Sequence, residues 1–184
     1  MKKVIFLDRD GTINEDSGFV YKIEDFKFLP KVIDSLKLLS KENFKFIIVT
    51  NQSGIGRGYY TEEDFLRFNN HIVNELLKDG IKIEKTYYCP HHPEHGVGEY
   101  KMDCTCRKPK TGLVIKAKEE FGINLLESIM IGDHPGDVEM GKKAGCKTIY
   151  VLTGHGKRHE VDSKEVNFIA KDLYEAAKWI LNNK

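Results

Sequence analysis

The sequence has neither a long apolar run nor a strong excess of charge of either sign. Its 184 residues include 29 basic and 28 acidic side chains, a formal net charge of +1. A nearly neutral chain has no global field that attracts nucleic acid or anionic lipid, so we expect neither partner. The first apolar run, Val4–Leu7, stops at Asp8 and is too short for a signal peptide or a membrane span. These features predict a cytoplasmic protein.

Internal repeats, low-complexity tracts and linkers rich in proline or glycine are also absent. The length allows one domain with a sizeable core, and we expect residues 1–184 to form a single, monomeric domain. Short apolar runs alternate with segments of helical periodicity, a pattern typical of a parallel α/β sheet covered by helices. Gly122 and Gly145 are predicted to end two of the helices. The predicted strands lie near 3–7, 44–49, 84–88, 128–132, 147–151 and, at the edge, 166–169, and the predicted helices near 31–42, 62–79, 111–122, 135–145 and 171–182.

Two carboxylates stand one residue apart where the first predicted strand ends, in Val-Ile-Phe-Leu-Asp8-Arg-Asp10-Gly11-Thr. Extended geometry would point Asp8 and Asp10 to the same side. Two carboxylates at such a short separation repel each other unless a cation or a shared proton compensates. Gly11 would permit a close backbone approach that a Cβ atom might block. Because ligands in open α/β sheets bind beyond the carboxyl ends of the strands, the pair indicates a metal-assisted active site.

Other strand ends add polar groups that we expect to converge on the same edge of the sheet. The second strand runs into Thr50-Asn-Gln-Ser-Gly, whose hydroxyl and amide groups suit phosphate oxygens. The fourth runs into Asp133, which could instead cap the helix that follows. Asp137 is predicted to support Lys108 or its loop rather than to bind metal.

Three of the four cysteines crowd into the segment 89–109, which reads Cys-x-His and, after twelve intervening residues, Cys-x-Cys. Three thiolates and an imidazole satisfy a closed tetrahedral zinc site, which would be structural because no position is left for water. The competing interpretation, a Cys104–Cys106 disulfide, closes a small strained ring and is disfavoured in a reducing cell. On spacing alone the imidazole could come from His91, His92 or His95.

These motifs, in this order, resemble those of the haloacid dehalogenase phosphatase superfamily: Asp-x-Asp-Gly-Thr at Asp8, a strand-terminal Thr50, Lys108 before a helix, and Gly-Asp-x-x-x-Asp around Asp133. Together with the Cys/His segment they are similar, more narrowly, to its zinc-loop group of heptose-bisphosphate and histidinol-phosphate phosphatases. The resemblance covers nearly the whole chain. It implies a Rossmann-like sheet with helices on both faces and no cap domain, and zinc held by Cys89, His91, Cys104 and Cys106.

The resemblance also implies an activity, which is the hydrolysis of a sugar phosphate, with a heptose bisphosphate as the expected substrate and histidinol phosphate as the alternative. A non-catalytic, zinc-containing interaction module that binds phosphate is the alternative of another class. Complete inactivity toward phosphomonoesters would favour that module.

Individual roles follow from the same resemblance. Asp8, Asp133 and the backbone carbonyl of Asp10 would hold Mg²⁺. Asp8 would attack phosphorus, while Asp10 would protonate the leaving oxygen and then deprotonate the hydrolytic water. Thr50 and Lys108 would neutralise charge on the phosphoryl group. Further substrate contacts are expected from Asp16, Ser17, Gly18, Phe19, Asn51, Gln52, Ser53 and Arg107, in addition to Thr50 and Lys108.

Three basic side chains are less well defined by the sequence. Arg107, planar and always charged, would recognise the substrate, whose second phosphate is one candidate. Arg57 either reaches an anionic substrate or is a solvated loop residue, and the pattern does not distinguish the two. His134 either neighbours the site in solvent or helps to position the water around a metal ion.

Overall fold

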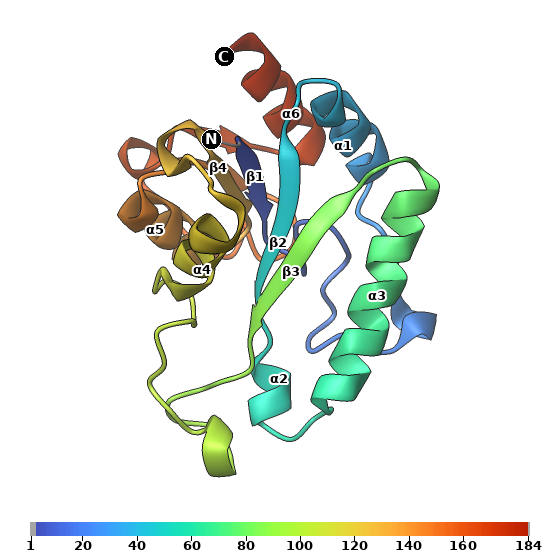
Figure 1. The fold of residues 1–184 in the computed structure, drawn as a ribbon, viewed down its shortest axis with the longest axis vertical. Coiled ribbons are helices and arrows are strands. Elements are labelled where there is room, and N and C mark those ends of the chain that lie inside the picture. Colours follow the sequence, from blue (N-terminus) through green and yellow to red (C-terminus); the bar gives the residue numbers. More distant parts are fainter. Residues whose placement is uncertain (1–2, 184) are drawn as a thin grey trace.

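The computed structural model describes residues 3–183, in which parallel strands form a single sheet between two layers of helices (Figure 1). The strand order is β3-β2-β1-β4-β5-β6. The direction of winding changes between β1 and β4, and open α/β sheets bind ligands at such a switch point. The strands are β1 (Val4–Leu7), β2 (Lys45–Asn51), β3 (Ile83–Cys89), β4 (Ile129–Gly132), β5 (Lys147–Val151) and β6 (Phe168–Ala170).

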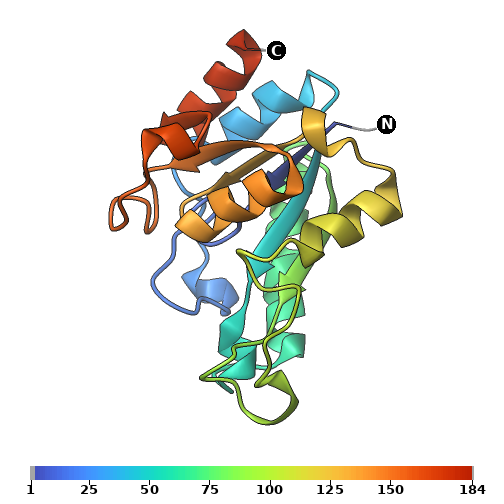
Figure 2. The same cartoon turned by 90° about the vertical axis from the view of Figure 1, so that its left-hand side faces the viewer.

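Helices cover both faces of the sheet, with α1, α3 and α6 on one face and α4 and α5 on the other (Figures 1 and 2). Their bounds are α1 (Val32–Ser40), α2 (Ser53–Gly56), α3 (Glu62–Lys78), α4 (Gly112–Phe121), α5 (Pro135–Ala144) and α6 (Leu173–Asn182), with short 3-10 helices at Ile23–Asp25, Gly98–Tyr100, Leu125–Glu127 and Ser163–Glu165. None of the helices within 3–183 is both long enough and apolar enough to cross a bilayer.

The central strands are buried on both sides because successive side chains of a strand point to opposite faces. In β1, Ile5 and Leu7 pack in the layer of α1, α3 and α6, whereas Val4 and Phe6 pack in the layer of α4 and α5. All four side chains are fully buried. The helices therefore cover the faces of the central strands and leave the ends of these strands accessible.

The predicted fold class is confirmed, and the predicted strands and helices match the observed ones to within a few residues. Gly122 and Gly145 follow α4 and α5 in the left-handed conformation, with φ of 64° and 85°, as predicted. The four-residue helix α2 was not predicted, because a segment that short shows no periodicity. Residues 1, 2 and 184, which belong to the predicted domain, lie outside the described residues.

The long segment between β3 and α4 is irregular apart from one 3-10 turn. It extends beyond the carboxyl end of β3 next to α2 (Figure 1). Two backbone hydrogen bonds attach it to α2: Gly56 N donates to Pro90 O at 3.1 Å, and Val97 N donates to Gly56 O at 2.8 Å. The segment is thus held beside the end of the sheet where ligands bind.

Candidate active site

A pocket of about 340 Å³ lies at the carboxyl ends of the central strands. Most of the predicted site residues line it, namely Asp8, Asp10, Asp16, Gly18, Phe19, Thr50, Asn51, Gln52, Ser53, Arg107, Lys108 and Asp133. Ser17 is exposed and is not among the lining residues. The pocket also includes Tyr60 and His155, which the sequence analysis missed, and His134 and Asp137.

Lys108 is buried at the base of this pocket between two carboxylates. Its Nζ lies 2.8 Å from Asp8 Oδ1 and 2.6 Å from Asp137 Oδ1, and it donates to the Val49 carbonyl at 3.0 Å. Burial opposes the charge on the ammonium group, but the carboxylates of Asp137 and Asp8 more than offset this and raise the pKa of Lys108. Lys108 therefore stays protonated at neutral pH, and the predicted contact of Asp137 with Lys108 is confirmed.

The end of β2 fixes the backbone that carries this lysine. Asn51 Oδ1 accepts from Lys108 N at 3.0 Å, and Asn51 Nδ2 donates to Lys108 O at 3.2 Å. Asn51, predicted as a substrate contact, thus also joins the second strand to the loop after the cysteines.

Three buried carboxylates meet beside Lys108. One oxygen from each of Asp8, Asp133 and Asp137 lies within 4.8 Å of the others. Burial, with repulsion from Asp137, raises the pKa of Asp8 to about 7, and burial, with repulsion from Asp8, raises the pKa of Asp133 to about 8. When all three are ionised, one ammonium leaves two negative charges uncompensated. This set of hard oxygen donors matches the charge and ligand preference of a divalent cation such as Mg²⁺.

Gly11 allows Asp133 to approach the end of β1. Its φ is 78°, and a Cβ atom at this position would lie 2.1 Å from Asp133 Oδ2. The same oxygen accepts from His155 N at 2.7 Å, and Thr153 Oγ1 donates to Gly11 O at 2.6 Å. The predicted need for glycine is confirmed, and the loop after β5 completes this side of the site.

The alternative role of Asp133 as a helix cap is wrong. His134 is the N-cap of α5, since its Nδ1 accepts from Gly136 N at 3.1 Å. Asp137 Oδ2 accepts from His134 N at 3.1 Å and completes the capping box. Because His134 caps the helix, the Asp133 carboxylate stays available to the pocket.

Asp10 interacts with a residue that sequence reasoning did not single out. Arg9 is almost completely buried and forms an ion pair with Asp10, with Nη2 2.9 Å from Oδ2. The sequence did contain a signal for this ion pair. Arg9 directly follows a predicted buried strand and stands between two carboxylates, and a charged residue in such a place needs a partner.

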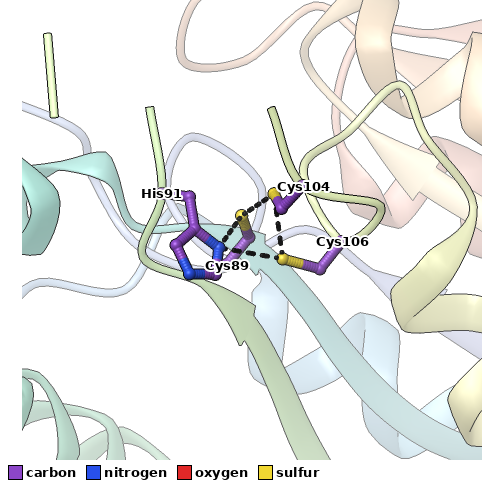
Figure 3. Close-up of side chains that lie close together, drawn as sticks. All are labelled: Cys89, His91, Cys104 and Cys106. Atoms are coloured by element: carbon purple, nitrogen blue, oxygen red, sulfur yellow. Dashed lines mark hydrogen bonds between the residues drawn. The ribbon is translucent and has the colours of Figure 1, made fainter. Parts of the chain in front are cut away.

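The four predicted zinc ligands come together at the end of β3 and in the segment that follows it (Figure 3). Cys89 Sγ lies 3.4 Å from Cys104 Sγ and 3.7 Å from His91 Nδ1, while Cys106 Sγ lies 3.2 Å from Cys104 Sγ and 3.3 Å from His91 Nδ1. Tetrahedral ligands around zinc stand about 3.5–3.8 Å apart, given the usual bond lengths. Hydrogen bonds from the neighbouring cysteines and His91 lower the pKa of Cys106. Soft donors at these distances fit a closed zinc site.

The structure also decides between the alternatives for this segment. All cysteines are free, and the 3.2 Å between the sulfurs of Cys104 and Cys106 is far longer than a disulfide bond, so that alternative is wrong. His92 Nδ1 accepts from the backbone N–H groups of Glu94 and His95 instead of facing the thiols. His91 is therefore the imidazole of the cluster.

The cluster lies next to the pocket along the chain and in space. Arg107 and Lys108 follow Cys106 directly, and both line the pocket. Arg107 Nη1 donates to the carbonyl of His91 at 3.2 Å. Whatever holds the four ligands in place therefore also limits where Arg107 and Lys108 can lie at the pocket.

Comparison with known proteins assigns the family. The HAD-hydrolase-like family model matches residues 105–176. The D-glycero-beta-D-manno-heptose-1,7-bisphosphate 7-phosphatase of Haemophilus influenzae is 47% identical over 155 residues, which are 84% of each chain. The D-glycero-alpha-D-manno-heptose-1,7-bisphosphate 7-phosphatase of Burkholderia mallei is 40% identical over 82% of this chain and 79% of its own. The chain belongs to the heptose-1,7-bisphosphate 7-phosphatase family. It is a phosphoric monoester hydrolase of the haloacid dehalogenase superfamily.

A solved structure agrees with this family. The D,D-heptose 1,7-bisphosphate phosphatase of B. bronchiseptica, complexed with magnesium and phosphate, matches with a TM-score of 0.87 and 26% identity over 99% of both chains.

We expect Lys108→Met to lower the free energy of unfolding of this phosphatase by about 3–5 kcal/mol at pH 8 in EDTA, because buried carboxylates lose their cation. The loss should be smaller at pH 6. The pKa values of Asp8 and Asp133, about 7 and about 8, lie above that pH, so the carboxyls take up protons and stop repelling each other. Urea unfolding at the two pH values measures both effects.

Lys110→Met is the matched control, because this lysine is 43% exposed and pairs with Asp103 at the surface. Its loss should stay below about 1 kcal/mol. Equal losses in both variants, or a larger loss for Lys108→Met at pH 6 than at pH 8, would contradict the role of the buried cation.

Proposed function

We propose that this chain removes the 7-phosphate of D-glycero-D-manno-heptose 1,7-bisphosphate with the help of Mg²⁺. The observation that carries the proposal is the pocket itself, which Asp8 and Asp10 both line and in which Asp8 contacts the buried cation Lys108. The names of the relatives support the substrate. We further propose that the chain acts as a monomeric, single-domain enzyme of the cytoplasm.

Asp8 is the proposed nucleophile. Its carboxylate lines the pocket and is held by Lys108, and it attacks phosphorus in line while the bond to the sugar oxygen breaks. Asp10 gives a proton to the leaving oxygen. In the second step Asp10 takes a proton from the water that attacks the aspartyl-phosphate, which releases phosphate and restores Asp8. Thr50 and Lys108 donate hydrogen bonds to the phosphoryl oxygens as negative charge spreads over them.

Asp8, Asp133 and the backbone carbonyl of Asp10 are the proposed ligands of Mg²⁺. A carboxylate and a phosphate dianion repel each other by about 4 kcal/mol per charge pair at ~4 Å and an effective dielectric constant of ~20. When bound, the ion supplies the positive charge that offsets this repulsion.

Arg107 is the proposed contact for the second phosphate of the substrate. Its side chain lines the pocket, and the His91 carbonyl fixes one of its nitrogens. A guanidinium group can bind two phosphate oxygens at once, which suits it to distinguish a bisphosphate from a monophosphate. Asp16, Gly18 and Phe19 also line the pocket and are the proposed contacts of the sugar.

Structural Zn²⁺ at Cys89, His91, Cys104 and Cys106 is part of the same proposal. The ion would fix the loop that carries Arg107 and Lys108, so that both cations point into the pocket without reorganisation when substrate binds.

Kinetics on a substrate panel test the proposed function. We expect kcat/KM to be highest for heptose 1,7-bisphosphate, assayed as separate α and β anomers, and clearly lower for heptose 7-phosphate and histidinol phosphate. Arg107→Met should reduce the preference for the bisphosphate over the monophosphate by about 10-fold or more.

A marked preference for histidinol phosphate would overturn the substrate assignment. No hydrolysis of any member of the panel with Mg²⁺ present would favour the non-catalytic interaction module.

The nucleophile is tested by Asp8→Asn. This change removes the attacking charge but keeps the shape of the side chain, so kcat should fall by at least about 10⁴-fold. Circular dichroism and thermal unfolding should show an intact fold. The surface substitution Asp103→Asn serves as the control for loss of one acidic charge. An Asp8→Asn variant with activity near that of the wild type would exclude covalent catalysis by Asp8.

Cys104→Ser tests the zinc proposal. Elemental analysis should find one zinc per wild-type chain, and the variant should lose most of it and unfold at a lower temperature. The control is Cys146→Ser, a buried cysteine outside the cluster, which should keep its zinc. Wild-type protein purified without zinc, or a Cys104→Ser variant with full zinc content, would refute the assignment.

A further inference from the structure

Arg9 is a buried cation for which the mechanism above has no use. Its side chain is 1% exposed, although arginine is rarely buried completely. The guanidinium carbon lies 5.0 Å from the ring centroid of Phe68 and 5.3 Å from that of Phe65, both on α3. Burying such a charge is unfavourable unless a partner and good geometry compensate. The group that compensates the buried charge of Arg9 therefore indicates what this residue does.

Arg9 holds the carboxylate of Asp10 with two hydrogen bonds. Nε donates to Oδ1 at 3.1 Å, and Nη2 donates to Oδ2 at 2.9 Å. This two-pronged arrangement fixes the plane of the carboxylate as well as its position. Nη2 also donates to Val20 O and Gln52 Oε1, each at 3.3 Å. The buried Nη1 has no hydrogen-bond partner in the part of the chain described. The hydrogen bonds of the guanidinium are thus made by Nε and Nη2, the two nitrogens that bind Asp10.

Two amide side chains complete the support of Asp10. Asn14 Nδ2 donates to Oδ1 at 2.9 Å, and Gln52 Nε2 donates to Oδ2 at 2.8 Å. Tyr60 in turn fixes the amide of Gln52 by donating to its Oε1 at 2.7 Å. Burial raises the pKa of Tyr60, so its hydroxyl stays protonated and remains a donor. Each oxygen of Asp10 thus receives two hydrogen bonds.

All of these donors lie on the protein side of Asp10. Arg9, Asn14 and Gln52 are exposed by 1%, 0% and 2%, whereas the Asp10 side chain is 20% exposed and lines the pocket. A substrate can therefore reach the Asp10 carboxyl group only from the pocket. The direction of the carboxyl group is set by side chains that are themselves almost completely buried.

We propose that Arg9 is a positioning residue, which aims the carboxyl group of Asp10 at the leaving oxygen of the substrate. The inference rests on the proposed role of Asp10 as the proton donor to that oxygen. The Arg9 guanidinium sets the direction in which Asp10 transfers its proton. Arg9, which does not contact the substrate, therefore controls the rate of hydrolysis for substrates with poor leaving groups.

Two substrates with different leaving groups test this role. A sugar alkoxide leaves slowly without a proton, whereas p-nitrophenolate is stable enough to leave without one. Arg9→Met should lower kcat/KM for the sugar phosphate by about 10²–10³-fold, within the usual range for general acid catalysis, and lower it for p-nitrophenyl phosphate by less than about 10-fold. A purely structural role would lower both values by the same factor and would overturn the proposal.

Asp10→Asn separates this proposal from the one on which it rests. If Asp10→Asn lowers kcat/KM equally for both substrates, Asp10 is not the proton donor and the proposed mechanism fails. If Asp10→Asn discriminates between the substrates and Arg9→Met does not, the mechanism stands and the role of Arg9 is refuted.

Two further variants act as controls. Arg9→Lys keeps the charge but cannot hold both oxygens in one plane, so the ratio of the two kcat/KM values should lie between those of wild type and Arg9→Met. Phe68→Leu removes a ring beside the guanidinium but none of its hydrogen bonds and should keep the wild-type ratio. If Arg9→Met does not fold, as judged by circular dichroism, Arg9→Lys decides, because a wild-type ratio in that variant overturns the proposal.

Discussion

At the base of the pocket, the ammonium group of Lys108 lies between the carboxylates of Asp8 and Asp137. Asp133 adds a third buried carboxylate to the same cluster. Burial and mutual repulsion raise the pKa values of Asp8 and Asp133, because one cation does not balance three anions. The fold thus builds a site that lacks positive charge when its carboxylates are ionised, a lack that either protons or a divalent cation would offset. The central strands and the buried lysine serve to keep those carboxylates together.

The position of Lys108 is determined from two directions. Asn51, at the end of β2, binds the backbone of Lys108 through both atoms of its amide. From the other side, the Cys/His cluster ends at Cys106, two residues before the lysine, and the His91 carbonyl holds Arg107 between them. A metal in that cluster would therefore act on the chemistry without touching the substrate, by limiting where two cations can lie.

Sequence reasoning found the residues whose role follows from their place on a strand. Asp8 and Asp133 were predictable because each follows a short apolar run, and the ends of parallel strands meet at one edge of the sheet. Gly11 was predictable because a turn beside two carboxylates leaves little room for a Cβ atom.

Other features depend on contacts between distant segments, which no local pattern reveals. Tyr60 and His155 reach the site from other segments, through the Tyr60 hydroxyl on Gln52 and the backbone N–H of His155 on Asp133. Arg9 is adjacent to Asp10 in the chain, but its contacts with Val20 and Gln52 also depend on the tertiary fold. The choice of His91 over its neighbours required the path of the loop in space, because all three histidines have suitable spacing. Ser17 follows Asp16 directly and was predicted by resemblance to contact substrate, yet it is exposed outside the pocket lining.

Calorimetric titration of the metal-free protein with Mg²⁺ tests most directly whether the carboxylate cluster is a cation site. The account predicts one ion per chain at pH 8, and weaker binding with release of protons at pH 6, since Asp8 and Asp133 must then lose protons to bind metal. Asp133→Asn should weaken binding by at least about 10-fold. The absence of binding at millimolar Mg²⁺, or an Asp133→Asn variant that binds the ion as tightly as the wild type, would contradict the account.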